Sequence, residues 1–150
     1  MHLFFLISLL NMIGFPNSVL AAGKAPTVTT QESFKKVKSA EVASWLKQNP
    51  MQLHIFDANT DEVRAKNGII NGAKTLSSSS NYIVAQMLPK DKNARLIFYC
   101  ANEKCTASHK AAQRALEAGY KDVLVMTDGI EGWRKSGQPT DPYSAEKQKP

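Results

Sequence analysis

The chemistry that this sequence offers is concentrated in its two cysteines and the residues between them. Cys100 and Cys105 lie in the segment LIFYCANEKCTASHKAAQRA, residues 96–115, and are the two cysteines of the 150-residue chain. Cys100 ends an apolar run and precedes a polar turn that leads into a helix-like stretch. Turn N–H groups and the positive end of a helix favour a thiolate, which is the nucleophilic form of the group. Lys104 adds positive potential and Glu103 opposes it. We expect a reactive thiolate at Cys100, with an inert buried cysteine as the alternative.

Alternating apolar and amphipathic stretches predict the elements that position this loop. After a short strand-like piece before Ser39, four apolar runs are expected to be strands: residues 53–56, 73–76, 95–100 and 122–126. Four stretches are expected to be helices: one capped by Ser39 and ended by Pro50, a short one ended by Pro89, residues 107–118 and residues 130–135. This order predicts an α/β fold with a largely parallel central sheet flanked by helices. Functional groups gather at the carboxyl ends of strands in such sheets, and Cys100 stands at one.

The composition indicates one globular domain and argues against some partners. A chain of 150 residues can bury a single core. The net charge is +6, from 19 Lys and Arg against 13 Asp and Glu, but the basic residues are scattered among acidic ones. Nucleic-acid binding is not expected, because it calls for a basic stripe or patch.

The first 22 residues contain no Lys, Arg, Asp or Glu and read as a secretory signal. Val19 and Ala21 have the spacing of a signal-peptidase site, which predicts a signal over residues 1–21. Pro16 and nearby polar residues interrupt the apolar span of about 20 residues that a membrane helix needs. We expect an exported protein, periplasmic or secreted, that meets the membrane only if this segment is uncleaved. The polar tail, residues 140–150, is expected to be disordered.

Several segments, in order over about residues 34–139, resemble the rhodanese-like domain. LHIFDANTDEV is similar to the family's strand that ends in an aspartate, GIINGAKTL to its Gly-His-Ile-Pro-Gly-Ala stretch, and DGIEGWRKSGQP to its closing Gly-Gly-x-x-x-Trp segment. LIFYC resembles the strand that delivers the active cysteine, and AAQRALEAGYKDV the helix and strand that follow.

The resemblance implies a sulfurtransferase that acts through Cys100. This residue would accept sulfane sulfur as a persulfide and pass it to a thiol or another nucleophile. Five residues of the loop would cradle the anionic sulfur with their backbone: Ala101, Asn102, Glu103, Lys104 and Thr106. The implied partners are a small sulfur-containing anion, a low-molecular-weight thiol or a protein thiol, and no cofactor is implied. The alternative is a non-catalytic binding module of the same fold, with a Cys100–Cys105 disulfide or a bound soft metal.

The loop departs from the family pattern in ways that bear on its substrate. It lacks the glycine and the arginine that family loops carry, and Cys105 stands where that arginine is expected. It is also about two residues longer than the common sulfurtransferase form, as in relatives that act on phosphate or arsenate. A phosphatase is not expected, because no arginine follows Cys100 before Arg114. Elsewhere, Asn59 replaces an arginine of many relatives and Asp128 replaces a glycine.

Cys105 has three competing interpretations beside that of a spectator. It can be a resolving thiol that attacks a persulfide on Cys100, or half of a standing disulfide. With Cys100 and His109 it can also hold copper or zinc, although the spacing is not a strong zinc signature. His109 itself is expected to face solvent, with proton donation to a leaving sulfur as the alternative. Asp57 is expected to fix loop amides rather than to do acid–base chemistry.

Overall fold

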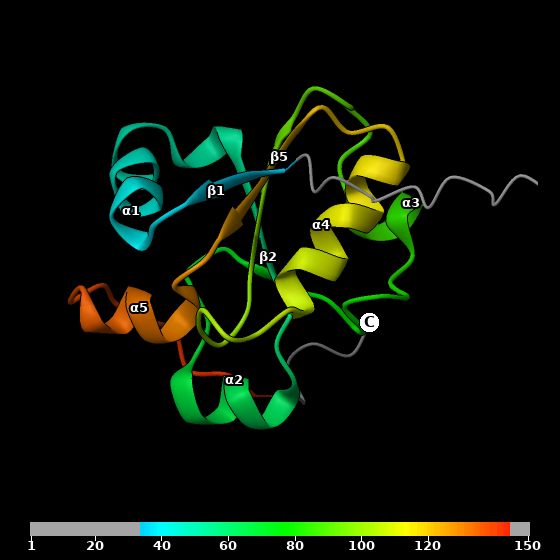
Figure 1. Ribbon diagram of the computed structural model, residues 1–150. Coiled ribbons are helices and arrows are strands. Elements are labelled where there is room, and N and C mark those ends of the chain that lie inside the picture. The colour runs from blue at the N-terminus through cyan, green and yellow to red at the C-terminus, as the bar shows by residue number, and fades with distance from the viewer. Residues whose placement is uncertain (1–33, 145–150) are drawn as a thin grey trace, which may run out of the picture. The chain divides into compact units, whose positions relative to one another are not determined.

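The computed structural model describes residues 34–144, in which five parallel strands form one sheet (Figure 1). The strand order is β1-β5-β4-β2-β3. The strands are β1 (Lys35–Val37), β2 (Leu53–Asp57), β3 (Lys74–Thr75), β4 (Arg95–Tyr99) and β5 (Asp122–Met126). The helices are α1 (Ser39–Gln48), the 3-10 turn η1 (Pro50–Gln52), α2 (Asp61–Asn67), α3 (Val84–Met87), α4 (Ala107–Glu117) and α5 (Gly129–Lys135). The predicted α/β class with a parallel sheet is confirmed.

The sheet separates two apolar cores, because successive side chains of a strand point to opposite faces. Phe56 and Phe98 are register partners and lie on the face that α3 and α4 cover. Ile55 and Ile97, the preceding pair, lie on the face that α1 and α5 cover. Figure 1 shows these two helix pairs on opposite sides of the strands. Burial on both faces explains why β4 reads as a continuous apolar run rather than an alternating one.

Helix α4 packs closely on the sheet through a face of small side chains. Ala111, Ala112 and Ala115 are all completely buried. Gly119 follows with a φ of +88°, a left-handed conformation that ends the helix at little cost for glycine. The close packing holds the start of α4 beside the end of β4, which is where the cysteine loop lies.

Helix α1 begins differently from the expectation, and Ser39 is not its cap. Lys38 is the N-cap, and its N–H donates to the Glu41 carboxylate at 3.0 Å. Ser39 is the first helical residue, and its hydroxyl donates to Asp128 Oδ2 at 2.6 Å. The Ser39 N–H also donates to this carboxylate, at 3.1 Å. Asp128, for which the sequence suggested no role, therefore ties the start of α1 to the start of α5.

Residues 140–144 are ordered, in contrast to the expectation of disorder from residue 140 onward. Asp141 and Ile69 form an antiparallel bridge, with N–H···O distances of 2.8 and 2.9 Å. Tyr143 donates its hydroxyl to Asp61 at 2.6 Å, and its ring lies 5.6 Å from the Arg64 guanidinium carbon. The polar composition of this segment wrongly suggested disorder, because backbone hydrogen bonds rather than apolar burial hold the segment in place.

The predicted signal over residues 1–21 and the tail after residue 144 lie outside the described residues. Within residues 34–144, no helix has both the length and the apolar character needed to cross a membrane.

Candidate functional site

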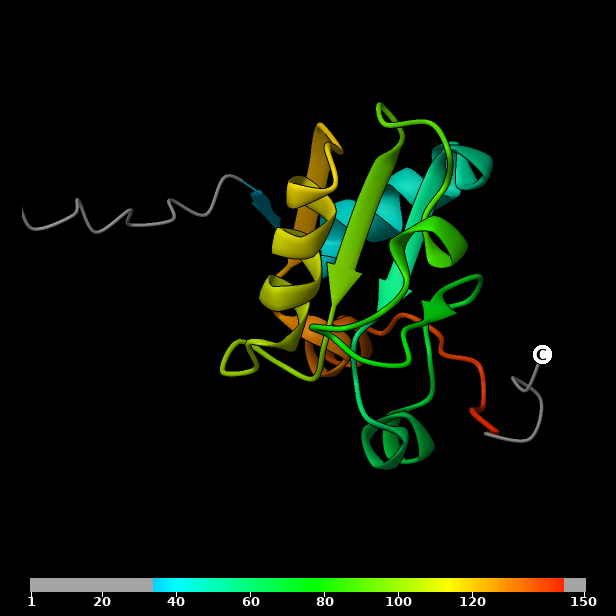
Figure 2. The ribbon, with the colours of Figure 1, turned by 90° about the vertical axis from the view of Figure 1, so that its right-hand side faces the viewer.

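Cys100 leaves the sheet from its central strand, β4, at the carboxyl edge. The preceding residue, Tyr99, pairs with Asp57 of β2 on one side and with Met126 of β5 on the other. Figure 2 shows the loop between β4 and α4 at the same end of the sheet as α2 and α5. The predicted placement of the cysteine at a strand end is therefore what the structure shows.

Helix α5 holds the first two carbonyl groups of this loop. Ile130 N–H donates to the Cys100 carbonyl at 2.9 Å, and Glu131 N–H donates to the Ala101 carbonyl at 3.0 Å. Gly129 makes this approach possible, because a Cβ at its position would lie 2.5 Å from the Cys100 carbonyl oxygen. Its φ of +62° also lies in the region that favours glycine. These two carbonyls consequently point toward α5.

The Cys100 sulfur is buried against the start of α4, with the residue only 2% exposed. Its Sγ lies 3.2 Å from the Cys105 carbonyl oxygen, which can accept only from a protonated thiol. The Ser108 hydroxyl is also 3.2 Å away, and the Ser108 N–H hydrogen-bonds the sulfur as well. The side chain of Cys105 lies near enough to affect the ionisation of this sulfur.

Burial and Cys105 together raise the pKa of Cys100 to about 11. Burial is the largest cause, because it disfavours the charged form, and the hydrogen bond with the Cys105 side chain comes next. The two hydrogen bonds from Ser108 act in the opposite direction. The expectation of an ionised, accessible thiolate is thus wrong for this conformation, because a carbonyl group and a second thiol face the sulfur.

The expected anion cradle is only partly formed. The amides of Lys104 and Cys105 are occupied by Asn102, through its side-chain and backbone oxygens respectively, at 3.1 Å each. Glu103, Lys104 and Thr106 are exposed, and Ala101 and Asn102 are half-buried. The residue that contacts the sulfur from α4 is instead Ser108, eight positions after Cys100, which was not among the predicted site residues.

A hollow of about 500 Å³ lies beside the loop. It is lined by Asn102, Glu103, Lys104, Asp128, Glu131, Gly132 and Lys135. Two of its acidic residues have partners: Glu103 pairs with Lys38 at 2.6 Å, and Glu131 accepts from the Asn102 side chain at 3.1 Å. The hollow therefore presents side chains of both charges beside the loop.

His109 packs against an aromatic ring instead of facing solvent. It is half-buried, and its ring meets Phe34 edge-on at a centroid distance of 5.3 Å. Its Nδ1 is buried without a hydrogen-bond partner among the described residues. The metal interpretation of Cys100, Cys105 and His109 gains no support, because residues 34–144 hold no cluster of three or more such side chains that fits an ion.

Asp57 is fully buried and organises the adjoining loop. It accepts the Asn59 N–H at 2.7 Å, the Tyr99 hydroxyl at 2.6 Å and the Arg64 Nε at 3.3 Å. Burial first, and then the negative charge of Asp57, raise the pKa of Tyr99 well above its ordinary value. Arg64 and Tyr99 were not foreseen, since their pairing with Asp57 depends on the tertiary fold. The network does not include Cys100.

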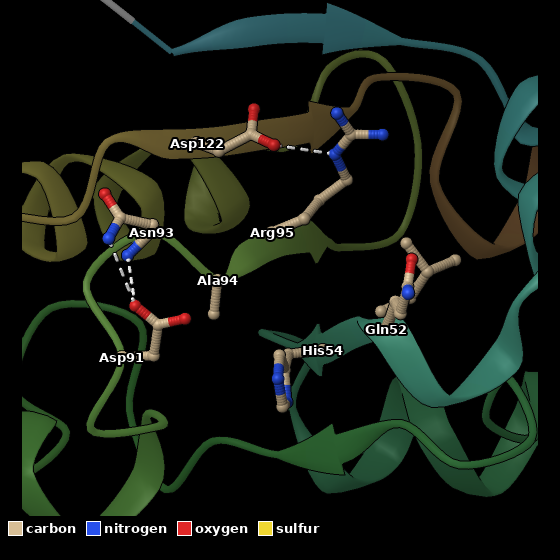
Figure 3. Close-up of a pocket in the computed structure, with 8 residues that line it drawn as sticks. Gln52, His54, Asp91, Asn93, Ala94, Arg95 and Asp122 are labelled. Atoms are coloured by element: carbon tan, nitrogen blue, oxygen red, sulfur yellow. Dashed lines mark hydrogen bonds and ion pairs between the residues drawn. The ribbon is translucent and has the colours of Figure 1, made fainter.

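A second hollow, of about 480 Å³, lies at the opposite edge of the sheet and is separate from the cysteine. Its lining comes from the amino ends of β2, β4 and β5 and the turn before β4: Gln52, Leu53, His54, Asp91, Asn93, Ala94, Arg95 and Asp122. Figure 3 shows Arg95 extended toward Asp122, with a 2.7 Å ion pair, rather than into the open space.

Comparison with known proteins places these features in context. The family model of the rhodanese-like domain matches residues 39–136. Arsenate reductase 2.1 of Oryza sativa subsp. japonica is 30% identical over 129 residues, which cover 77% of each protein. The rhodanese-like domain of an Anabaena protein superimposes with a TM-score of 0.60 at 19% identity, covering 77% of this chain and 83% of that one. The polysulfide-sulfur transferase of Wolinella succinogenes gives a TM-score of 0.56 at 19% identity, covering 75% and 81%.

Proposed function

This chain belongs to the rhodanese-like domain family, and we propose that it is a sulfurtransferase that carries sulfane sulfur as a persulfide on Cys100. The observation that supports the proposal most is the placement of the Cys100 sulfur. It lies where the central strand ends and at the start of α4, with the Ser108 hydroxyl 3.2 Å away and able to donate to it. A donor at this position stabilises the Cys100 thiolate, which is the form that attacks the sulfur donor.

The proposed reaction has two transfers. The Cys100 thiolate attacks the outer sulfur of a donor such as thiosulfate or polysulfide, and the remainder of the donor leaves with the bonding electron pair. An acceptor thiolate then takes that sulfur and releases Cys100. The first step requires that the Cys100 proton leave, and with it the hydrogen bond to the Cys105 carbonyl. The loop must therefore turn this carbonyl aside before transfer.

The burial of Cys100 also favours one candidate from another class, a non-catalytic module. A thiol with a pKa of about 11 in a closed site would remain protonated at neutral pH and would react slowly. Such a domain would act through the charged hollow beside the loop.

Arsenate reduction, which the name of the rice relative states, is not part of the proposal. A tetrahedral oxyanion is best held by a guanidinium that donates two parallel hydrogen bonds. The segment Ala101–Thr106 has a single cationic side chain, the exposed Lys104.

The test is mass spectrometry of the reduced protein after incubation with thiosulfate or polysulfide. A gain of one sulfur atom, lost in Cys100→Ser and retained in a variant of another region such as Lys47→Ser, supports the sulfurtransferase. An unchanged mass with both donors over a wide pH range supports the module instead.

The proposed place of action is outside the cytoplasm, on the strength of the signal-like residues 1–21 alone. N-terminal sequencing of the protein from its native cell tests this, and recovery of an intact Met1 would refute it.

A further inference from the structure

The second cysteine lies against the first, and this contact gives it a chemical role. We propose that Cys105 is a resolving thiol that reduces the sulfur held on Cys100 to sulfide. The inference rests on the proposed carrier function and goes beyond it, because it replaces transfer to an outside acceptor with release inside the site.

The loop is folded so that Cys105 returns to Cys100. Asn102 forms the turn, since its carbonyl accepts the Cys105 N–H and its side chain accepts the Lys104 N–H. The Asn102 amide group is itself anchored to Glu131 of α5. The result is a Cys105 carbonyl oxygen 3.2 Å from the Cys100 Sγ, so that the two cysteines are in direct contact.

The two thiols differ in exposure, and the difference suits different roles. Cys100 is buried, whereas Cys105 is half-exposed. Neither cysteine is part of a disulfide in this structure. Because Cys105 belongs to the same loop and contacts Cys100, only a local shift of the loop is needed to bring its sulfur to a persulfide there.

The proposed step is a thiol–disulfide type displacement at the inner sulfur. The Cys105 thiolate attacks the Cys100 Sγ of the persulfide and forms an Sγ–Sγ bond. The bond from that Sγ to the outer sulfur breaks, and the outer sulfur leaves as hydrosulfide with the electron pair. The Cys105 proton is released and hydrosulfide can take it up as hydrogen sulfide. One sulfane sulfur is reduced by two electrons, and the two cysteine sulfurs are oxidised to a disulfide.

The product state defines the reaction that must follow. The Cys100–Cys105 disulfide cannot accept another sulfane sulfur until it is reduced. A dithiol, which attacks one sulfur and then closes its own disulfide, restores both thiols in a balanced exchange. The kind of partner implied is therefore a dithiol reductant, and the half-exposed Cys105 is the sulfur it can reach.

The experiment follows one turnover in the full chain. The protein is reduced, freed of reductant, loaded with a limiting amount of polysulfide and sampled for sulfide and for peptides under non-reducing conditions. Trypsin cuts after Arg95, Lys104 and Lys110, so the two cysteines fall in separate peptides, 96–104 and 105–110, that only a disulfide joins. We expect about one sulfide per chain and joined peptides, and a second turnover only after dithiothreitol is added.

Two variants separate this inference from the function on which it rests. Cys105→Ser and Cys105→Ala should keep the extra sulfur on peptide 96–104 and release sulfide at least 10-fold more slowly. If the wild-type chain holds its persulfide as long as these variants do, or if the sulfur moves onto peptide 105–110, Cys105 is not a resolving thiol although the carrier function stands. If no variant with an intact Cys100 gains sulfur, the proposed function fails first. Matching thermal unfolding of all three proteins excludes misfolding as the cause.

Discussion

The reactivity of Cys100 should be low at neutral pH and should rise steeply in alkali. With a pKa of about 11, roughly one thiol in 10,000 is ionised at pH 7, against about 3% of a cysteine with an ordinary pKa of about 8.5. This difference of about 300-fold is partly offset, because the more basic thiolate is the better nucleophile by about 10-fold over the same pKa interval. We therefore expect alkylation of Cys100 by iodoacetamide to be about 30-fold slower than that of a free cysteine peptide at pH 7. The rate should increase about 10-fold per pH unit up to about pH 10.

The assay is timed alkylation followed by peptide mapping, in which peptide 96–104 reports Cys100 and peptide 105–110 reports Cys105 within the same sample.

The same pKa shift predicts that the free energy of unfolding falls as pH rises into the alkaline range. Because the folded thiol has the higher pKa, the unfolded chain ionises first, so this contribution to stability is complete below the ordinary pKa. It is lost as pH rises from about 9 to about 11. The difference between wild type and Cys100→Ser in urea unfolding should therefore decline over this interval. A Cys100 that alkylates with a midpoint below pH 8 would refute the account of the buried, carbonyl-bonded thiol.

Three further substitutions test the frame of the site, each by urea unfolding. Gly129→Ala should destabilise the fold by about 1–3 kcal/mol more than Gly137→Ala. Both glycines have positive φ, but only a Cβ at residue 129 would collide with the cysteine loop. Equal losses in the two variants would contradict the close approach of Gly129 to this loop. Gly132→Ala should destabilise the wild type, because its Cβ would lie 2.5 Å from the Asp128 side chain. In an Asp128→Gly background the same change should stabilise by up to about 1 kcal/mol through helix propensity, and the absence of this reversal would remove the steric explanation. Asp57→Asn should cost about 1–3 kcal/mol, because it removes the buried carboxylate beside Arg64 and leaves the exposed Asp61 as the remaining ion-pair partner. A loss below about 1 kcal/mol would show that the network is not important for stability.

The sequence predicted the fold better than it predicted the chemistry, for reasons that individual residues show. The apolar runs of β4 and β5 need burial on both faces, and few arrangements other than a parallel sheet supply it. Helix α2 was missed because its sequence, DEVRAKN, has little apolar periodicity. Its Arg64 is instead drawn into the protein by Asp57.

The state of Cys100 could not be predicted in the same way. Its position at a strand end before a helix predicted a stabilised anion, and Ser108 does provide that influence. The pKa of Cys100 is raised instead by the burial of its sulfur and by the contact with Cys105, whose carbonyl group faces it. Neither follows from residue types or spacing, because both depend on how α5 and Asn102 shape the loop.

The antiparallel bridge between Asp141 and Ile69 has a practical consequence for where the domain ends. Gly68 accommodates the returning chain, because a Cβ there would lie 2.6 Å from the Asp141 carbonyl oxygen. The family model stops at residue 136, before this crossing. A protein shortened to the family boundary would lose the Tyr143 contacts with α2 and would leave Arg64 open to water on one side. In such a shortened chain, α2 would be held less firmly. A loss of activity could then come from this change in α2, and it would be a mistake to read it as a direct role of the removed residues in the reaction.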